Sequence, residues 1–140
     1  MIMLDTNVVS EPLRAVASPA VIAWLDRQNI ETLFLSTISL AELRYGVAAL
    51  PEGRRKDGLR AALEERIFSL FGSRILAFDT AAADAYAVIR ARARTAGKTT
   101  GASDGYIAAT AAANGFAVAT RDTGPFEAAG VLVVNPWEAV

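Results

Sequence analysis

The sequence predicts an α/β protein with a mainly parallel central sheet of about five short strands, covered by helices on both faces. Two observations support this prediction. Short apolar runs alternate with longer segments whose apolar residues recur at helical spacing. The apolar runs also contain few polar residues, which is typical of strands buried on both faces of a parallel sheet. With 140 residues, the chain is expected to form one domain over residues 1–140.

The expected strands are short, and turn or capping residues separate them from the helices. They lie at residues 2–4, 32–36, 74–78, 116–120 and 131–134. The expected helices run from Pro19 to about Gln28, from a cap at Ser39 to a stop at Pro51, from about Glu52 to Phe71, from a cap at Asp79 or Thr80 to near Gly97, and from Ala102 to Asn114, before Gly115. The third helix is expected to bury a stripe formed by Leu59, Leu63, Ile67 and Leu70.

The composition excludes several kinds of catalysis. The chain has no histidine and no cysteine. A Ser-His-Asp triad, a Cys-His pair, a zinc site of the usual ligands and a histidine-based ribonuclease are therefore all excluded. No apolar run approaches the roughly 20 residues that span a membrane, and no basic flank precedes the apolar N-terminus. We expect a cytoplasmic protein without a membrane contact.

Four acidic residues stand where the strands end or where the following helices begin. Asp5 follows the first strand, Glu42 and Asp104 lie in first helical turns, and Asp122 lies just past the fourth strand. Each has a simpler structural explanation when it is taken singly, because acids cap helices, favour helix N-termini and occur in turns. Asp79 fits that simpler explanation as an N-cap, and we leave it out of the site.

Taken together, the four acids indicate a metal site. Ligands in parallel α/β folds bind beyond the carboxyl ends of the strands, and all four acids can point at that edge. Glu42 lies beside a core stripe and Asp104 lies in the least polar helix, so neither belongs to a clearly solvated face. Two carboxylates about 5 Å apart repel by roughly 3 kcal/mol at an effective dielectric constant of about 20. A hard divalent cation, Mg²⁺ or Mn²⁺, would relieve this repulsion.

Basic residues are clustered although the net charge is only −1. One cluster includes Arg54, Arg55 and Lys56, and the other includes Arg90, Arg92, Arg94 and Lys98. Solvated helix faces are the favoured explanation, and an RNA contact by Arg90, Arg94 and Lys98 is the alternative. "GKTTG" is not a phosphate-binding loop, because Arg92 stands where that pattern needs a glycine and because the stretch follows a helix.

Four stretches occur in the order and spacing of a known family. They are "MIMLDTNVVSE", "STISLAELRYG", "ASDGYIAATAAANGFAVATRDTGPF" and "LVVNPWE", and together they extend over nearly the whole chain. They resemble the PIN-domain nucleases, in particular the FitB-like branch of the VapC toxins.

The resemblance implies a three-layer α/β/α domain and a Mg²⁺- or Mn²⁺-dependent endoribonuclease that acts as the toxin of a type II toxin–antitoxin system. It assigns the metal and the catalysis to Asp5, Glu42, Asp104 and Asp122, with support from Thr6 and Thr120. It also implies a cognate antitoxin that covers the acidic groove and contacts promoter DNA, and a toxin homodimer. RNA cleavage by water activated at the metal would leave 5′-phosphate and 3′-hydroxyl ends, because no histidine is present to promote attack by the 2′-hydroxyl.

Two other functions remain open from the sequence. A Mg²⁺ phosphohydrolase of the haloacid dehalogenase type also begins with an aspartate after the first strand. It needs a second aspartate two residues later, where this chain has Asn7. Alternatively, the acidic groove serves only to bind a partner that carries an arginine. In the nuclease hypothesis, Asp5 holds the metal and does not cap a helix, and Thr6 and Asn7 are expected to orient its carboxylate.

Overall fold

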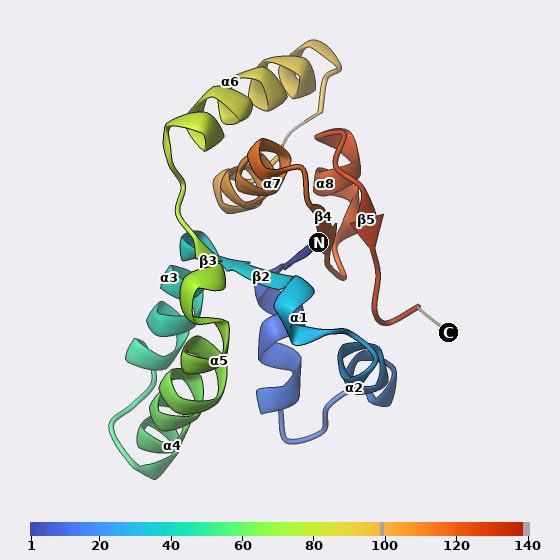
Figure 1. Cartoon of the computed structure of the whole chain (residues 1–140). Coiled ribbons are helices and arrows are strands. Elements are labelled where there is room, and N and C mark those ends of the chain that lie inside the picture. The colour runs from blue at the N-terminus through green and yellow to red at the C-terminus, as the bar shows by residue number, and fades with distance from the viewer. Residues whose placement is uncertain (99, 139–140) are drawn as a thin grey trace.

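The computed structural model describes residues 1–98 and 100–138, and these form a parallel sheet with the strand order β3-β2-β1-β4-β5 (Figure 1). Thr99, within the "GKTTG" stretch, lies outside the described residues. The strands are β1 (Ile2–Leu4), β2 (Leu33–Ser36), β3 (Ile75–Leu76), β4 (Ala117–Ala119) and β5 (Val133–Val134). The predicted parallel sheet is confirmed, although β3, β4 and β5 are shorter than expected.

Helices cover both faces of the sheet. They are α1 (Thr6–Ser10), α2 (Pro19–Asp26), α3 (Thr37–Ala48), α4 (Arg54–Ala62), α5 (Ser69–Phe71), α6 (Thr80–Thr95), α7 (Ala102–Asn114) and α8 (Thr123–Ala128). The 3₁₀ turns are η1 (Glu11–Leu13), η2 (Ile30–Thr32) and η4 (Gly72–Arg74), and η3 (Leu63–Phe68) is a π-helix. Figure 1 shows α1 to α5 on one side of the sheet and α6 to α8 on the other. No helix in the described part of the chain is long and apolar enough to cross a membrane.

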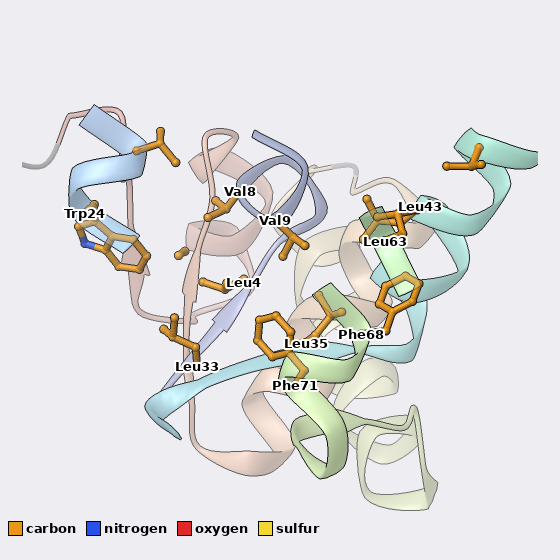
Figure 2. Packing of buried hydrophobic residues seen from close by; sticks show 13 residues of the cluster. Leu4, Val8, Val9, Trp24, Leu33, Leu35, Leu43, Leu63, Phe68 and Phe71 are labelled. Carbon is orange, nitrogen blue, oxygen red and sulfur yellow. The ribbon is translucent and has the colours of Figure 1, made fainter. Parts of the chain in front are cut away.

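The core consists of two clusters, one on each face of the sheet. Leu4 packs on the side of α1 to α5 with Trp24, Leu35 and Phe71, and Figure 2 shows this cluster. Met3, one residue earlier in the same strand, packs on the opposite side in the cluster of Ile107 and Phe126, which come from α7 and α8. Successive side chains of a strand point to opposite faces, so both faces of β1 are buried. The predicted three-layer arrangement is therefore confirmed.

The start of α3 differs from the prediction. Ser36, and not Ser39, is the N-cap residue, and its hydroxyl oxygen accepts a hydrogen bond from the Ser39 backbone N–H at 3.0 Å. Ser36 is also the last residue of β2, with extended backbone angles, so the strand runs into the helix without a linker. The predicted cap was three residues too late because the apolar pattern alone does not show where the strand ends.

The segment from Arg54 to Phe71 is helical, as expected, but it is not a regular α-helix. Its middle part, η3, is π-helical, with α4 before it and α5 after it. A π-helical turn contains more residues than an α-helical turn and rotates the following side chains around the axis. Leu70 is consequently 53 % exposed, whereas Phe68 and Phe71 are buried. The prediction that Leu70 belongs to the core stripe was wrong for this reason.

Glycine 105 sets the distance between α7 and α6. A Cβ atom at this position would lie 3.1 Å from Cε2 of Tyr86, which is closer than ordinary van der Waals contact. Glycine therefore allows the first turn of α7 to approach α6. The same turn carries Asp104, one of the four predicted site residues. At the other end of α7, Gly115 adopts the left-handed conformation that terminates the helix, as predicted.

Candidate active site

The chain changes direction across the sheet at β1, and the candidate site lies at the carboxyl end of that strand. From β1 the sheet extends through β2 to β3 on one side, and the chain then returns to place β4 and β5 on the other side. Such a switch point opens a crevice beyond the carboxyl ends of the two strands that flank it. Asp5 follows β1 directly, and Thr120 follows β4 directly. The backbone N–H of Asp5 donates to the Ala119 carbonyl oxygen at 2.9 Å and holds the two strand ends together.

Asp5 is the most deeply buried of the four predicted acids, with an exposed fraction of 5 %. Its Oδ1 accepts a hydrogen bond from the Thr6 backbone N–H, and its Oδ2 accepts one from the Thr120 hydroxyl, each at 2.8 Å. Burial raises the pKa of Asp5 from 3.8 to about 6; the two hydrogen bonds oppose this change and the charges of Asp104 and Glu42 add to it. Near neutral pH, the buried position of Asp5 therefore disfavours the ionised form of its carboxyl group.

Asp5 also occupies the N-cap position of α1. This short helix was not predicted, because five residues are too few for a helical pattern to be recognised. The expectation that Asp5 does not cap a helix is therefore corrected. Its bond goes to the first residue of the helix, whereas a usual cap bonds to the second or third residue. The capping position orients the carboxylate at the strand end, and the cost of burying its charge remains.

Thr120 connects Asp5 to Asp122. It is completely buried, and its hydroxyl donates to Asp5 while it accepts from the Asp122 backbone N–H at 3.1 Å. Asn7 adds two longer contacts, from its Nδ2 to the Thr120 hydroxyl at 3.5 Å and from the Arg121 backbone N–H to its Oδ1 at 3.4 Å. One hydroxyl group therefore fixes the turn after β4 against the end of β1.

Glu42 enters the site from the second turn of α3 and not, as predicted, from the first turn, because the helix already begins at Thr37. Its side chain is exposed, and its Oε1 accepts a hydrogen bond from the Thr6 hydroxyl at 2.7 Å. The predicted supporting residues Thr6 and Thr120 thus each hold one of the predicted acids, Thr6 through Glu42 and Thr120 through Asp5.

Asp104 and Asp122 complete the set. The pKa of the half-buried Asp104 is raised, chiefly by burial and further by the charges of Asp122 and Glu42. Since the charges of Glu42 and Asp104 also act on Asp5, the four acids from separate parts of the chain share one electrostatic environment. Within the described residues, none of the four forms an ion pair with a lysine or an arginine. Within the described part of the protein, no direct ion pair therefore relieves their mutual repulsion.

The chemistry of these ligands fits a hard divalent cation. The four acids offer only carboxylate oxygens, which Mg²⁺ and Mn²⁺ prefer, and no soft ligand is present. Among residues 1–98 and 100–138, no three acids stand close enough, as their side chains lie, to enclose a metal ion. Repulsion between like charges favours such a spread arrangement. Asp122 is exposed, so its side chain can move toward the other acids.

The predicted RNA contacts lie on another part of the surface. Arg90, Arg94 and Lys98, here called the α6 basic cluster, are exposed and line a cavity of about 540 Å³ near the end of α6. Arg90 also donates to the Thr100 carbonyl and lies 5.7 Å from the ring of Tyr86, so part of its role is structural. Its side chain reaches within 3.8 Å of a Cβ built on Gly105, the residue after Asp104.

Sequence reasoning missed one residue of this region, Ser39. Ser39 is buried and its hydroxyl lies 3.0 Å from that of Thr6, but it was interpreted only as a helix cap. Its position three residues before Glu42 on a helix was a usable indication, because residues at this spacing lie on the same face. Asn7 was expected, with Thr6, to orient Asp5. Its side chain instead contacts the Thr120 hydroxyl and the Arg121 backbone N–H, contacts that depend on the tertiary fold and have no local pattern.

Comparison with known proteins identifies the family. The family model described as the PIN domain matches residues 2–132. The chain belongs to the PIN-domain family. It is 55 % identical over 137 residues to Toxin FitB of Neisseria gonorrhoeae, covering 98 % of this chain and 99 % of that protein. It is 54 % identical over 138 residues to VapC ribonuclease Y4jK of Sinorhizobium fredii, covering 99 % of each.

A solved structure agrees with these sequence relationships. The chain matches a crystal structure of FitAcB from Neisseria gonorrhoeae with a TM-score of 0.96 and 54 % identity, over 99 % of this chain and 100 % of that one. The predicted resemblance to PIN-domain VapC toxins of the FitB-like branch is confirmed.

Proposed function

We propose that this protein is the toxin of a type II toxin–antitoxin system and cleaves RNA as a Mg²⁺- or Mn²⁺-dependent endoribonuclease. The observation that carries the proposal is the group of four acids at the carboxyl end of β1. Similarity to proteins named as a VapC ribonuclease and a FitB toxin supports the same class. Membership in the PIN-domain family also favours a nuclease over a phosphohydrolase of the haloacid dehalogenase type.

Asp5, Glu42, Asp104 and Asp122 would hold the cation, directly or through water. When bound, such an ion activates water and stabilises the charge that develops in an in-line displacement at phosphorus. The protein contributes orientation: Thr120 fixes Asp5 at 2.8 Å, and Thr6 fixes Glu42 at 2.7 Å. A scissile phosphate at this sheet edge would be drawn to the cation that the carboxylates hold, and hydrolysis would leave 5′-phosphate and 3′-hydroxyl ends.

The α6 basic cluster is the proposed RNA contact away from the acids. Its Arg90 approaches the first turn of α7, where Asp104 lies, so a nucleic-acid strand leaving the acidic site along α7 would meet the cluster. Arginine and lysine there would neutralise backbone phosphates without reading the sequence. The cavity beside these residues offers space for such a phosphate.

The proposed partner is a cognate antitoxin. Solved structures similar to this chain include FitAB bound to an IR36 DNA fragment, at 52 % identity and a TM-score of 0.96, over 100 % of this chain and 98 % of that chain. In this protein an open cavity of about 920 Å³ runs from Glu42 along Leu43, Val47 and Leu59. A segment of the antitoxin lying in this cavity would reach the acids, where an arginine could pair with them. We further propose a toxin homodimer, a cytoplasmic location and contact with promoter DNA only through the antitoxin.

Cleavage of RNA by the purified protein tests the proposal. The wild type should cut RNA with Mg²⁺ or Mn²⁺ and lose activity in EDTA. Asp104→Asn should be nearly inactive under both conditions, and a matched control, Asp79→Asn, should retain activity because Asp79 only caps α6. Failure of the wild type to cut would favour the non-catalytic binding module. A covalent phospho-aspartate on Asp5 would instead favour the phosphohydrolase.

A further inference from the structure

A row of hydroxyl groups leads from the core to Glu42. The Ser36 hydroxyl lies 3.3 Å from that of Ser39, which lies 3.0 Å from that of Thr6, and Thr6 lies 2.7 Å from Oε1 of Glu42. Ser36 and Ser39 are completely buried, so water does not compete for these contacts. The row connects α1 to α3 and begins at the strand end of β2.

Counting hydrogens gives the row a direction. Each hydroxyl has a single hydrogen to donate. The carboxylate of Glu42 has no hydrogen, so the Thr6 hydroxyl donates to it, and Thr6 has no second hydrogen for Ser39. The contact between Thr6 and Ser39 therefore requires Ser39 to donate, and Ser39 then accepts from Ser36, whose own oxygen accepts from the Ser39 backbone N–H. The opposite direction would leave the hydroxyl hydrogen of the buried Ser36 without an acceptor among the described residues, which is costly. Only the first direction satisfies every group.

We propose that Ser39 is a positioning residue that holds the carboxylate of Glu42 toward the acidic site by acting through Thr6. The inference rests on the proposed function, because it assigns a role in that same site. Each donated hydrogen bond polarises the next, so the contact to Glu42 is stronger than an isolated hydroxyl would make. Ser39 and Glu42 lie three residues apart on one face of α3, but Thr6 of α1 joins them. The row therefore ties the orientation of Glu42 to the end of β1, where Asp5 lies.

A simple packing role for Ser39 would have different consequences. Ser39→Ala would then change stability to the same extent whether or not Glu42 is present. If Ser39 acts through Thr6 on Glu42, its removal should matter only while the carboxylate is there. A double-mutant cycle separates the two cases, because groups that act through one another give non-additive effects.

The experiment uses the full chain as wild type, Ser39→Ala, Glu42→Ala and the double variant. Mn²⁺ affinity is measured by electron paramagnetic resonance, and urea unfolding is measured in EDTA. In the otherwise wild-type chain, Ser39→Ala should weaken Mn²⁺ binding about tenfold, which is the smaller of the losses typical for residues that orient metal ligands. In the Glu42→Ala background, the same substitution should have no effect on Mn²⁺ binding. In EDTA, the unfolding equilibrium constant of the double variant should differ by about threefold or more from the value expected if the two single substitutions acted independently.

Control variants test whether the effect belongs to the hydroxyl groups of Ser39 and Thr6. Thr110→Val removes another completely buried hydroxyl, which bonds the Tyr106 carbonyl of its own helix, and should leave Mn²⁺ affinity unchanged. Thr6→Ser keeps the hydroxyl and should bind Mn²⁺ as the wild type does. Thr6→Val lacks the hydroxyl and should bind Mn²⁺ more weakly than the wild type. Additive effects in either cycle would overturn the role of Ser39. A wild type that binds no Mn²⁺ would refute the proposed function, and the cycle in EDTA would then decide the role of Ser39 by itself.

Discussion

Replacing Asp5 by asparagine should change how the stability of the metal-free protein depends on pH. In the folded protein the pKa of Asp5 is about 6, against a usual value of 3.8. The fold therefore prefers the neutral carboxyl. The stability that Asp5 contributes is fully present below pH 3.8 and is lost as the pH rises through about 6. This difference in pKa corresponds to roughly 3 kcal/mol.

Part of that loss falls in a range that is easy to measure. Between pH 5 and pH 7, the Asp5 contribution should fall by about 1 kcal/mol. Asp5→Asn removes the titrating group, and the difference in unfolding free energy between variant and wild type should therefore increase by that amount over this range. At pH 7 the variant should be more stable than the wild type by up to about 2 kcal/mol, because the asparagine avoids the buried charge but loses the acceptor for the Thr120 hydroxyl.

Urea unfolding in EDTA at pH 5, 6 and 7 measures this effect. The comparison cancels the contributions of groups that do not interact with Asp5, whereas the interaction of Asp5 with Asp104 and Glu42 is part of the measured difference. Added Mn²⁺ should reverse the order of stability at pH 7, since the cation favours the ionised wild-type carboxylate. The affinity of the wild type for Mn²⁺ should fall below pH 6, where protons compete with the cation for the Asp5 carboxylate. A difference in unfolding free energy between Asp5→Asn and wild type that stays constant from pH 5 to pH 7 would refute the assignment of a raised pKa to Asp5.

Three further predictions concern other parts of the molecule. Asp104→Asn should reduce the stabilisation by Mn²⁺, which for the wild type is about 2.7 kcal/mol at a hundredfold excess over Kd; thermal unfolding with and without Mn²⁺ measures this, and equal shifts in both proteins would count against the site. Gly105→Ala should destabilise the fold by about 1 to 3 kcal/mol, because its Cβ would meet the Tyr86 ring at 3.1 Å; Gly124→Ala, where nothing lies within 4 Å, is the matched control in urea unfolding. Neutralising the α6 basic cluster should weaken RNA binding and lower its dependence on salt; an unchanged slope of log affinity against log salt would leave the cluster as a solvated helix face.

The arrangement of the sheet could be predicted because it depends on local patterns. Apolar runs mark the strands, and Gly115 ends α7 where a left-handed residue is needed. The acids could be predicted as a group because parallel strands bring their carboxyl ends to one edge of the sheet. The parallel direction of the strands thus places Asp5 and Asp122 at the same edge, whereas the pairing of β1 with β4 is known only from the structure.

Other features depend on the tertiary structure and could not be predicted. The π-helical turn of η3 exposes Leu70 although its spacing fits an α-helical core stripe. The contact between Thr6 and Glu42 depends on how α1 packs against α3, two elements that α2 and β2 separate in the chain. The hydrogen bond from Arg90 to the Thr100 carbonyl could not be predicted either, because in the sequence Arg90 is one of several basic residues expected on a solvated helix face.

The ends of the RNA products test the central claim most directly. Wild type and Asp5→Asn are incubated with one RNA and Mn²⁺, circular dichroism verifies that both are folded, and the termini of the fragments are identified. We predict that the wild type gives 5′-phosphate and 3′-hydroxyl ends and that folded Asp5→Asn gives almost no product, because it lacks the charge that holds the cation. Cleavage by folded Asp5→Asn at the wild-type rate, or products with 2′,3′-cyclic phosphate ends, would contradict a mechanism based on a metal held by carboxylates.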